Sequence, residues 1–270
     1  MAAQQLPFGA LLRRWRQQRR MTQLDLALAA GSSTRHLSCL ETGRAQPSRE
    51  MIAQLGDCLN IPLREQNALL LAAGFAPAYQ ERSLEELEVA KQAMDTVLAA
   101  HLPYPAFAVD RHWDVVLSNS ALPELYEGCS EELLSPPVNA VRLVLHPQGM
   151  AARILNYADW RAHTLHLLRS QAEARQDPGL EALIAEVLSY PDPIRTGRTS
   201  GFEGPQRLAT PLIISTRFGT VSLLNTLTVF GTPNDVTLAE LALEMLFPAD
   251  RETVAVVRRM EQERTARLTQ

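Results

Sequence analysis

The 270-residue sequence has few cysteines and no long apolar run. Its three cysteines are odd in number and show no Cys-x-x-Cys spacing, which argues against a disulfide framework or a zinc ribbon and fits a reducing cytoplasm. No apolar stretch approaches the roughly 18 residues of a membrane span, so we expect no membrane partner. The N-terminal arginines follow a short apolar stretch, the reverse of their order in a secretory signal, so we expect no such signal.

Lysine is nearly absent, since Lys91 is the one lysine among 26 basic residues. The charge is also uneven along the chain. Residues 1–75 hold nine Arg and five Asp or Glu, a net charge of +4, and the remaining residues hold a net charge of −8, which together give the overall −4. A basic head on an acidic body favours a polyanion as the partner of the head alone.

Enzyme motifs are also missing: there is no Gly-x-Ser-x-Gly, no phosphate-binding loop, no Gly-x-Gly-x-x-Gly after a strand and no Cys/His nucleophile pair. Asp159, His163 and His166 share one helix face, so a metal-dependent enzyme has to be considered. A further ligand is lacking, and isolated pairs of this kind occur by chance, so a solvated helix face is the better interpretation. We expect no catalytic residue, no cofactor and no metal site.

A short stretch near the N-terminus predicts two helices joined by a tight turn. Thr22 is a good N-cap for the first, and Gly31 supplies the turn, where a positive φ costs little. The second would run from Thr34 to about Glu41. Two short helices at a steep angle are the geometry of a helix-turn-helix, whose second helix lies in the DNA major groove. The residues expected to form the buried stripe of the first helix, 23–30, are Leu24, Ala27 and Leu28.

Further helices flank this pair. An amphipathic helix precedes it from Phe8 to Arg20, a fourth follows the N-cap Ser48, and a fifth starts near Pro62 and ends at Gly74. The first domain, residues 1–75, is therefore expected to be an all-α bundle of five helices.

The segment RRWRQQRRMTQLDLALAAGSSTRHLSCLETGRAQPS resembles the lambda-repressor-like (Cro/XRE) helix-turn-helix family. The matching marks are Thr22-Gln23, Ala27, Gly31, Leu37, the block from Leu40 to Arg44, and Pro47-Ser48. The resemblance covers residues 8–74. It implies a transcription regulator that binds double-stranded DNA as a homodimer, with recognition helices about 34 Å apart reading an inverted repeat.

The resemblance also implies which side chains face DNA. Arg35 is the best base reader, because a guanidinium can grip O6 and N7 of guanine together. Arg44 and Arg13 suit phosphate anchors, which position the protein without specifying sequence. Gln23 would contact phosphate or brace a neighbouring reader, and Cys39 departs from the polar residue usual at its position. The full set of expected DNA contacts is Gln23, Ser33, Thr34, Arg35, Ser38, Arg44 and Arg13.

Residues 76–104 predict a connector and a linker helix. Ser83 to Glu86 has the form of a capping box, which would open a helix from Leu84 to about Ala100. Its apolar positions fall near heptad spacing, which fits a dimer helix or a helix packed on the next domain. Barely two heptads favour the second interpretation.

Residues 105–270 predict an α+β domain. β-Branched runs and turns predict strands at 106–109, 113–118, 210–216 and 220–230, and helices at 159–174, from the N-cap Asp177 to about 190, and from the cap Asp250 to about 267. Residues 195–206 predict a polar, Gly-rich loop. Residues 236–247 fit either helix or strand, and we favour a strand because it would complete the sheet.

This region resembles the ligand-binding domain of MmyB-like transcription regulators. The segments that carry the resemblance are FAVDRHWDVVLSN, NAVRLVLHP, the helix with Trp160, and FGTPNDVTLAELALEMLFPADRET. The resemblance implies a PAS-like fold, a curved antiparallel sheet with helices around an apolar cavity. It also implies sensing of an apolar small molecule, with a fatty acid as the leading candidate. Residues 190–206 depart from the commoner family pattern.

A cavity of this kind could bury an acyl tail at about 0.8 kcal/mol per CH₂. The residues expected to line it are Phe107, Val109, Trp113, Leu143, Trp160 and Leu224, and those expected to hold a polar head are Asn119, His146 and Arg217. For most of the apolar ones, a simple core role is the better interpretation. The alternative function is a DNA-binding protein whose C-terminal domain is an antitoxin-like, protein-interaction module.

Overall fold

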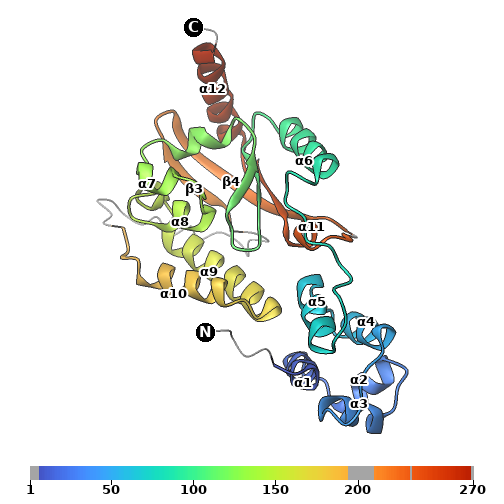
Figure 1. Ribbon diagram of the computed structural model, residues 1–270. Helices are drawn as coiled ribbons and strands as arrows, with labels where there is room; N and C mark the ends of the chain where they lie inside the picture. Colours follow the sequence, from blue (N-terminus) through green and yellow to red (C-terminus); the bar gives the residue numbers. More distant parts are fainter. Residues whose placement is uncertain (1–5, 194–209, 232, 269–270) are drawn as a thin grey trace. The chain divides into compact units, whose positions relative to one another are not determined.

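The computed structural model describes residues 6–193, 210–231 and 233–268 (Figure 1). The chain divides into two compact units. The helical unit comprises residues 1–83 and 232–239, and the sheet unit comprises residues 84–231 and 240–270. The expected loop at 195–206 lies outside the described residues.

Residues 6–83 of the helical unit form five helices, as the sequence predicts. They are α1 (Phe8–Gln18), α2 (Gln23–Ala29), α3 (Thr34–Glu41), α4 (Arg49–Cys58) and α5 (Leu63–Ala72). Thr22 and Asp25 form the capping box that opens α2, and the hydroxyls of Ser33 and Ser48 cap α3 and α4. Gly31, in the turn between α2 and α3, has a φ of 52°. α2, α3 and α4 therefore begin where a side chain accepts from a first-turn amide, whereas α1 and α5 each follow a proline, Pro7 and Pro62, and have no side-chain cap.

The expected buried stripe of α2 was partly wrong. Leu24 and Leu28 are 56% and 70% exposed, whereas Leu26 and Ala27 are buried, as is Ala30 just after the helix. Leu24 and Leu28 lie two residues on either side of Leu26, a turn of about 200° that places them on the opposite face. The core of the helical unit includes Leu12, Trp15, Leu26, Leu37, Leu40, Ile52, Leu55, Leu59 and Leu69.

The linker helix begins later than expected. α6 runs over Glu88–Ala100, with Leu87 at its N-cap, and residues 84–86 form a turn. The expected capping box therefore does not open this helix. α6 packs against β1 and β2 through a face that includes Met94 and Leu98, so it has the packing role that the short heptad pattern favours.

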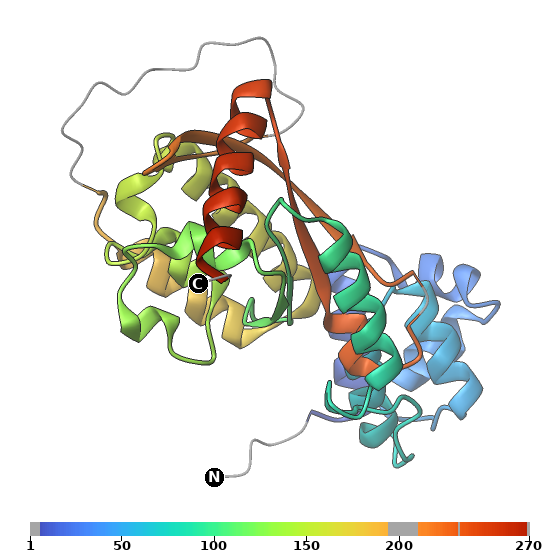
Figure 2. The same ribbon diagram turned by 90° about the horizontal axis from the view of Figure 1, so that it is seen from above.

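Five antiparallel strands form the sheet, in the order β2-β1-β5-β4-β3. They are β1 (Ala106–Val109), β2 (Val115–Ser118), β3 (Leu212–Thr216), β4 (Gly219–Val229) and β5 (Ala242–Pro248). Two hairpins, β1–β2 and β3–β4, flank β5. Figures 1 and 2 show the long strands β4 and β5 curling across the unit. This is the curved antiparallel sheet expected of a PAS-like domain.

Residues 236–247 split between the two interpretations. The first half is the short helix α11 (Val236–Glu240) and the second half enters β5. Asp235 stops the strand pattern, because its carboxylate accepts from the amides of Thr237 and Leu238 and so starts the helical turn. The other carboxylate oxygen, Oδ2, accepts from Nε of Arg82 over 2.9 Å. This hydrogen bond joins the start of α11 to the connector.

Helices cover the sheet and enclose the core. They are η1 (Leu122–Tyr126), α7 (Glu131–Leu134), α8 (Ala140–Leu145), η2 (Ala151–Arg153), α9 (Tyr157–Arg175), α10 (Pro178–Ser189) and α12 (Arg251–Leu268). α9 and α10 run side by side, and α12 packs on β4 and β5 (Figures 1 and 2). Asp177 and Asp250 cap α10 and α12, as expected. The main apolar core lies between these helices and one face of the sheet.

Candidate DNA-binding surface and ligand pocket

A buried charge cluster fixes the helix-turn-helix from inside. The guanidinium of Arg16 on α1 donates to both carboxylate oxygens of Glu41 at the end of α3, over 2.6 and 2.9 Å. Gln23, the first residue of α2, donates to the same carboxylate at 2.8 Å. Burial by itself would raise the pKa of Glu41, but the hydrogen bonds from Arg16 and Gln23, with the charges of Arg16 and Arg13, hold it below its usual value. Three helices are therefore joined at one carboxylate.

The outer end of α3 is open to solvent. Thr34 and Arg35 are exposed in its first turn, and Ser33 is exposed at its N-cap, where its hydroxyl accepts from the amide of His36. Ser38, one turn further, is half-buried. A helix start with an exposed guanidinium and solvent-exposed Ser and Thr side chains has the chemistry needed to read base edges.

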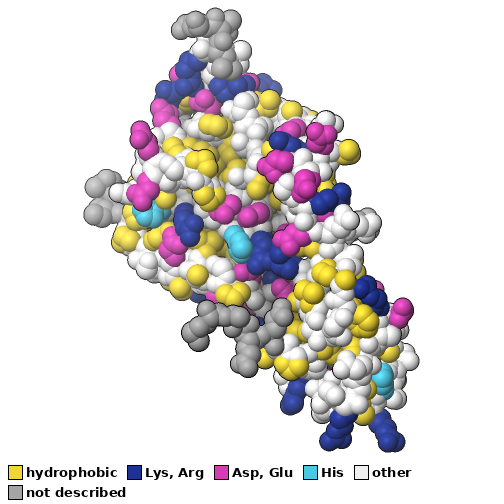
Figure 3. All heavy atoms as spheres, in the orientation of Figure 1, with side chains coloured by type: hydrophobic (Ala, Val, Ile, Leu, Met, Phe, Trp, Pro, Cys, Tyr) yellow, Lys and Arg dark blue, Asp and Glu magenta, His cyan; other side chains and the backbone are white. Residues whose placement is uncertain are grey.

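The other residues expected to contact DNA, Arg13, Gln23 and Arg44, lie outside α3. Arg13 on α1 and Arg44 after α3 are exposed, whereas the amide of Gln23 is held by Glu41. Gln23 therefore suits the bracing role better than phosphate contact. Figure 3 shows basic side chains, all of them Arg because the single lysine lies in the sheet unit, gathered at one end of the helical unit. Cys39 is half-buried and is a free thiol, and nothing in the structure explains its departure from the family pattern.

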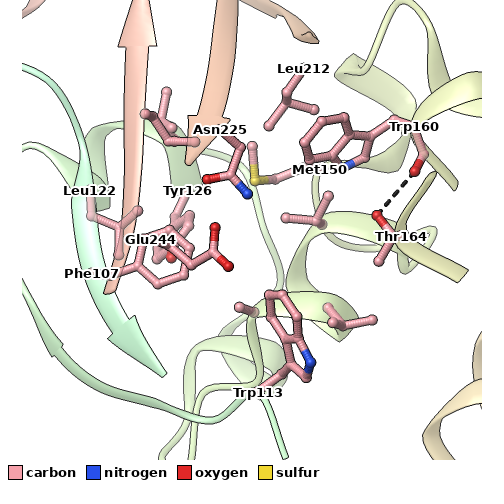
Figure 4. Close-up of a pocket in the computed structure, with 15 residues that line it drawn as sticks. Phe107, Trp113, Leu122, Tyr126, Met150, Trp160, Thr164, Leu212, Asn225 and Glu244 are labelled. Carbon is pink, nitrogen blue, oxygen red and sulfur yellow. Dashed lines mark hydrogen bonds between the residues drawn. The ribbon is translucent and has the colours of Figure 1, made fainter. Parts of the chain in front are cut away.

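The sheet unit contains an apolar pocket between the sheet and the helices (Figure 4). Its cavity volume is about 70 Å³, below the roughly 300–1,000 Å³ of most small-molecule sites, so a ligand with a sizeable apolar body requires the walls to move apart. Three residues expected to line a cavity, Phe107, Trp113 and Trp160, do line this one. The other lining residues are Leu122, Leu125, Tyr126, Ala140, Val141, Val144, Met150, Thr164, Leu212, Asn225, Glu244 and Leu246.

Three further apolar candidates lie elsewhere. Val109 and Leu143 are buried, and Leu224 on β4 is half-buried, but none of them is among the lining residues. Leu224 pairs with Phe247 and Asn225 pairs with Leu246, so strand alternation turns Leu224 to the face away from the pocket.

The three polar candidates also lie elsewhere, because each is engaged by the fold. The amide of Asn119 donates to the carbonyls of Leu98 and Tyr104 and accepts from two backbone amides. His146 packs edge-on against the ring of Tyr190, with centroids 4.9 Å apart. Arg217 pairs with carboxylates and lies over a neighbouring phenyl ring. None of these three side chains lines the pocket.

Two polar residues that line the pocket, Glu244 and Asn225, were not predicted from the sequence. Glu244 on β5 is 1% exposed, and within the described part of the chain neither of its carboxylate oxygens has a hydrogen-bond partner. Asn225 on β4 lies beside it, and its carbonyl oxygen is likewise unpartnered there. Burial raises the pKa of Glu244 to about 7, against a smaller opposing effect of the Asn225 amide. A charged residue inside the apolar run LALEMLF was the signal that could have found it.

The helix face with Asp159, His163 and His166 borders a second, more polar hollow next to β3. His163 packs on the Trp160 ring at 5.3 Å. Across the described ranges, no group of three or more His, Cys, Asp or Glu side chains is arranged to hold a metal ion.

Comparison with protein families covers both units. Residues 7–69 match a helix-turn-helix domain, and residues 90–260, more than half of the chain, match the MmyB-like transcription regulator ligand binding domain. The chain belongs to this MmyB-like family. Comparison with curated proteins found no match. The MmyB-like regulator thus combines an N-terminal DNA-binding domain with a ligand-sensing domain. None of its described helices has the length and apolarity needed to cross a bilayer.

Proposed function

We propose that this MmyB-like regulator is a homodimer that binds a specific DNA sequence, and that an apolar small molecule in the pocket sets its occupancy. Residues 1–75 bind DNA, residues 105–270 hold the ligand, and residues 76–104 connect them. The observation that carries the proposal is a mainly apolar pocket in the family's ligand-binding domain, on a chain whose other unit exposes the start of a recognition helix.

On the DNA side, the exposed guanidinium of Arg35 reads guanine, with Thr34 and Ser38 beside it on α3. Ser33 contributes from the N-cap, and Arg13 and Arg44 hold phosphates. Gln23 orients α3 through Glu41. Two copies reading an inverted repeat would place their recognition helices about 34 Å apart.

On the ligand side, Trp113, Trp160 and Phe107 supply aromatic walls for an apolar body. Each buried CH₂ group would contribute about 0.8 kcal/mol. A chain like that of a fatty acid is the candidate that the family resemblance supplies. The ligand regulates DNA binding only if it binds two conformations of the protein with different affinity.

Native mass spectrometry of the purified full chain tests the proposal. We expect a dimer that retains a small molecule, and we expect Thr164→Trp, which fills the pocket, to lose that mass while remaining a dimer. Exposed Gln92→Trp on α6 is the matched control and should keep the mass. A chain that holds no small molecule and instead forms a stable stoichiometric complex with another protein would support the antitoxin-like alternative.

A further inference from the structure

The pocket is mainly apolar, yet it contains a buried acid. Glu244 faces the pocket from β5, where it pairs with the lining residue Phe107 of β1. Asn225 lies diagonally across on β4 and shares that face, because its direct partner Leu246 is also a lining residue. Figure 4 shows both polar ends directed into the same space. Two side chains that can accept hydrogen bonds therefore meet inside an apolar wall.

Within the described chain the Asn225 amide is the donor that opposes the raised pKa of Glu244, but its contact with the carboxylate falls short of hydrogen-bond geometry. Both carboxylate oxygens of Glu244 and the carbonyl oxygen of Asn225 lack a hydrogen-bond partner within that part of the chain. Two nearby donors are already used: the Thr164 hydroxyl donates to the Trp160 carbonyl at 3.0 Å, and the Trp113 indole donates to Gln171 at 2.9 Å. A buried carboxylate without a partner is costly for a fold to keep. Such a group is therefore expected to meet its donor in a ligand.

The charges of the residues lining the pocket indicate which head group the ligand carries. Glu244 and Tyr126 are the titratable residues among those lining the pocket, and none of the lining residues is Lys, Arg or His. Burial raises the pKa of the Tyr126 phenol, so this group stays neutral at physiological pH. A carboxylate ligand would bring a second anion to Glu244, or would have to share its proton. An ammonium group would supply donors and the opposite charge.

We propose that the pocket binds an amphipathic amine, whose ammonium group donates to Glu244 and to the carbonyl oxygen of Asn225 while its apolar body lies against Trp113 and Trp160. This rests on the proposed function, because it names the chemistry of the ligand for the same site. The family resemblance implies a fatty acid, whose apolar chain fits the pocket walls. Its carboxylate head does not fit beside Glu244.

Calorimetric titration of the full chain at pH 8 with three probes of equal length, n-octylamine, n-octanol and octanoate, tests the proposal. We expect octylamine to bind at least tenfold more tightly than octanoate, with octanol between them. This series needs no variant, so folding defects do not affect it. Glu244→Gln should remove the preference for the amine and leave the affinity for octanol within about twofold, since a twofold change is under 0.5 kcal/mol.

Surface attraction is the main competing source of an amine preference in an acidic protein. Glu132→Gln removes an exposed carboxylate of the same unit and should leave the affinity for octylamine unchanged. Octanoate binding as tightly as octylamine, or an unchanged amine affinity in Glu244→Gln, would overturn the proposal while leaving an apolar sensor intact. If none of the three probes binds and the purified protein holds no small molecule, the proposed function fails together with it.

Discussion

Arg16 and Glu41 form a two-point ion pair between the first and third helices, with Nε–Oε1 and Nη2–Oε2 distances of 2.6 and 2.9 Å. The Glu41 side chain is 3% exposed and that of Arg16 is 11% exposed. Both groups left water on folding, so each depends on the other for its hydrogen bonds. The angle at which α3 presents Arg35 therefore rests on a pair that makes no DNA contact itself.

Glu41→Gln should lower the free energy of unfolding of the helical unit by about 3 kcal/mol, because it leaves the Arg16 charge buried and uncompensated. Urea unfolding at pH 7 measures this. Glu81→Gln, which removes the exposed partner of Arg64, is the control and should cost less than about 1 kcal/mol. Folding lowers the pKa of Glu41, so the difference between wild type and Glu41→Gln should shrink as pH falls through that pKa. Equal losses in the two variants would contradict this account.

Leu26→Ala and Leu28→Ala should differ sharply although the residues lie on the same short helix. Leu26 is fully buried in the core, and its truncation should cost about 2–5 kcal/mol. Leu28 is 70% exposed, and its truncation should stay within about 0.5 kcal/mol. Thermal unfolding of the two variants measures the difference. A large loss of stability in Leu28→Ala would mean that Leu28, and not Leu26, lies on the buried face of α2.

Asn119→Ala should destabilise the sheet unit by about 3 kcal/mol, because it removes the side-chain hydrogen-bond partner of the buried backbone groups of Tyr104 and Ala106. Gln92→Ala on the exposed face of α6 is the control. Where the variant is folded, its affinity for octanol should equal that of wild type. A selective loss of ligand affinity without loss of stability would instead give Asn119 the head-group role expected from sequence.

Glu244→Gln should raise the free energy of unfolding at pH 8 more than it does at pH 5. The difference between the two increases should be on the order of 2–3 kcal/mol. Folding raises the pKa of Glu244 from its ordinary 4.5 to about 7, so the folded chain holds this proton more tightly than the unfolded chain. Stability of the wild type is then lost as pH rises across that window, and the amide variant escapes the loss. Urea unfolding at both pH values checks this; an equal effect at the two values would contradict a raised pKa.

Much of the helical unit could be predicted because its signals are local. Thr22, Ser33 and Ser48 each cap the helix that they precede in sequence. The burial of Leu26 in place of Leu24 and Leu28 escaped prediction, because both choices satisfy helical spacing and only packing against the other helices selects between them.

The pocket was harder to predict, because its walls come from distant parts of the chain. Three aromatic residues were placed correctly, but Asn119 looked like a free polar group until its four hydrogen-bond partners were in place. Glu244 sits in a strand that the sequence left ambiguous with a helix. Which way its side chain points depends on the register of β5 against β1 and β4, a long-range property that no local pattern contains.

The DNA selectivity of Arg35→Ala measures whether α3 reads the DNA sequence. A duplex selected from random DNA by the wild-type chain is titrated against a shuffled duplex by fluorescence anisotropy. We expect Arg35→Ala to lower the affinity ratio of the two duplexes at least tenfold, since a bidentate contact to guanine is worth about 1–3 kcal/mol. Arg44→Ala should weaken both duplexes alike and reduce the salt slope by about 1. An unchanged ratio in Arg35→Ala would contradict the account.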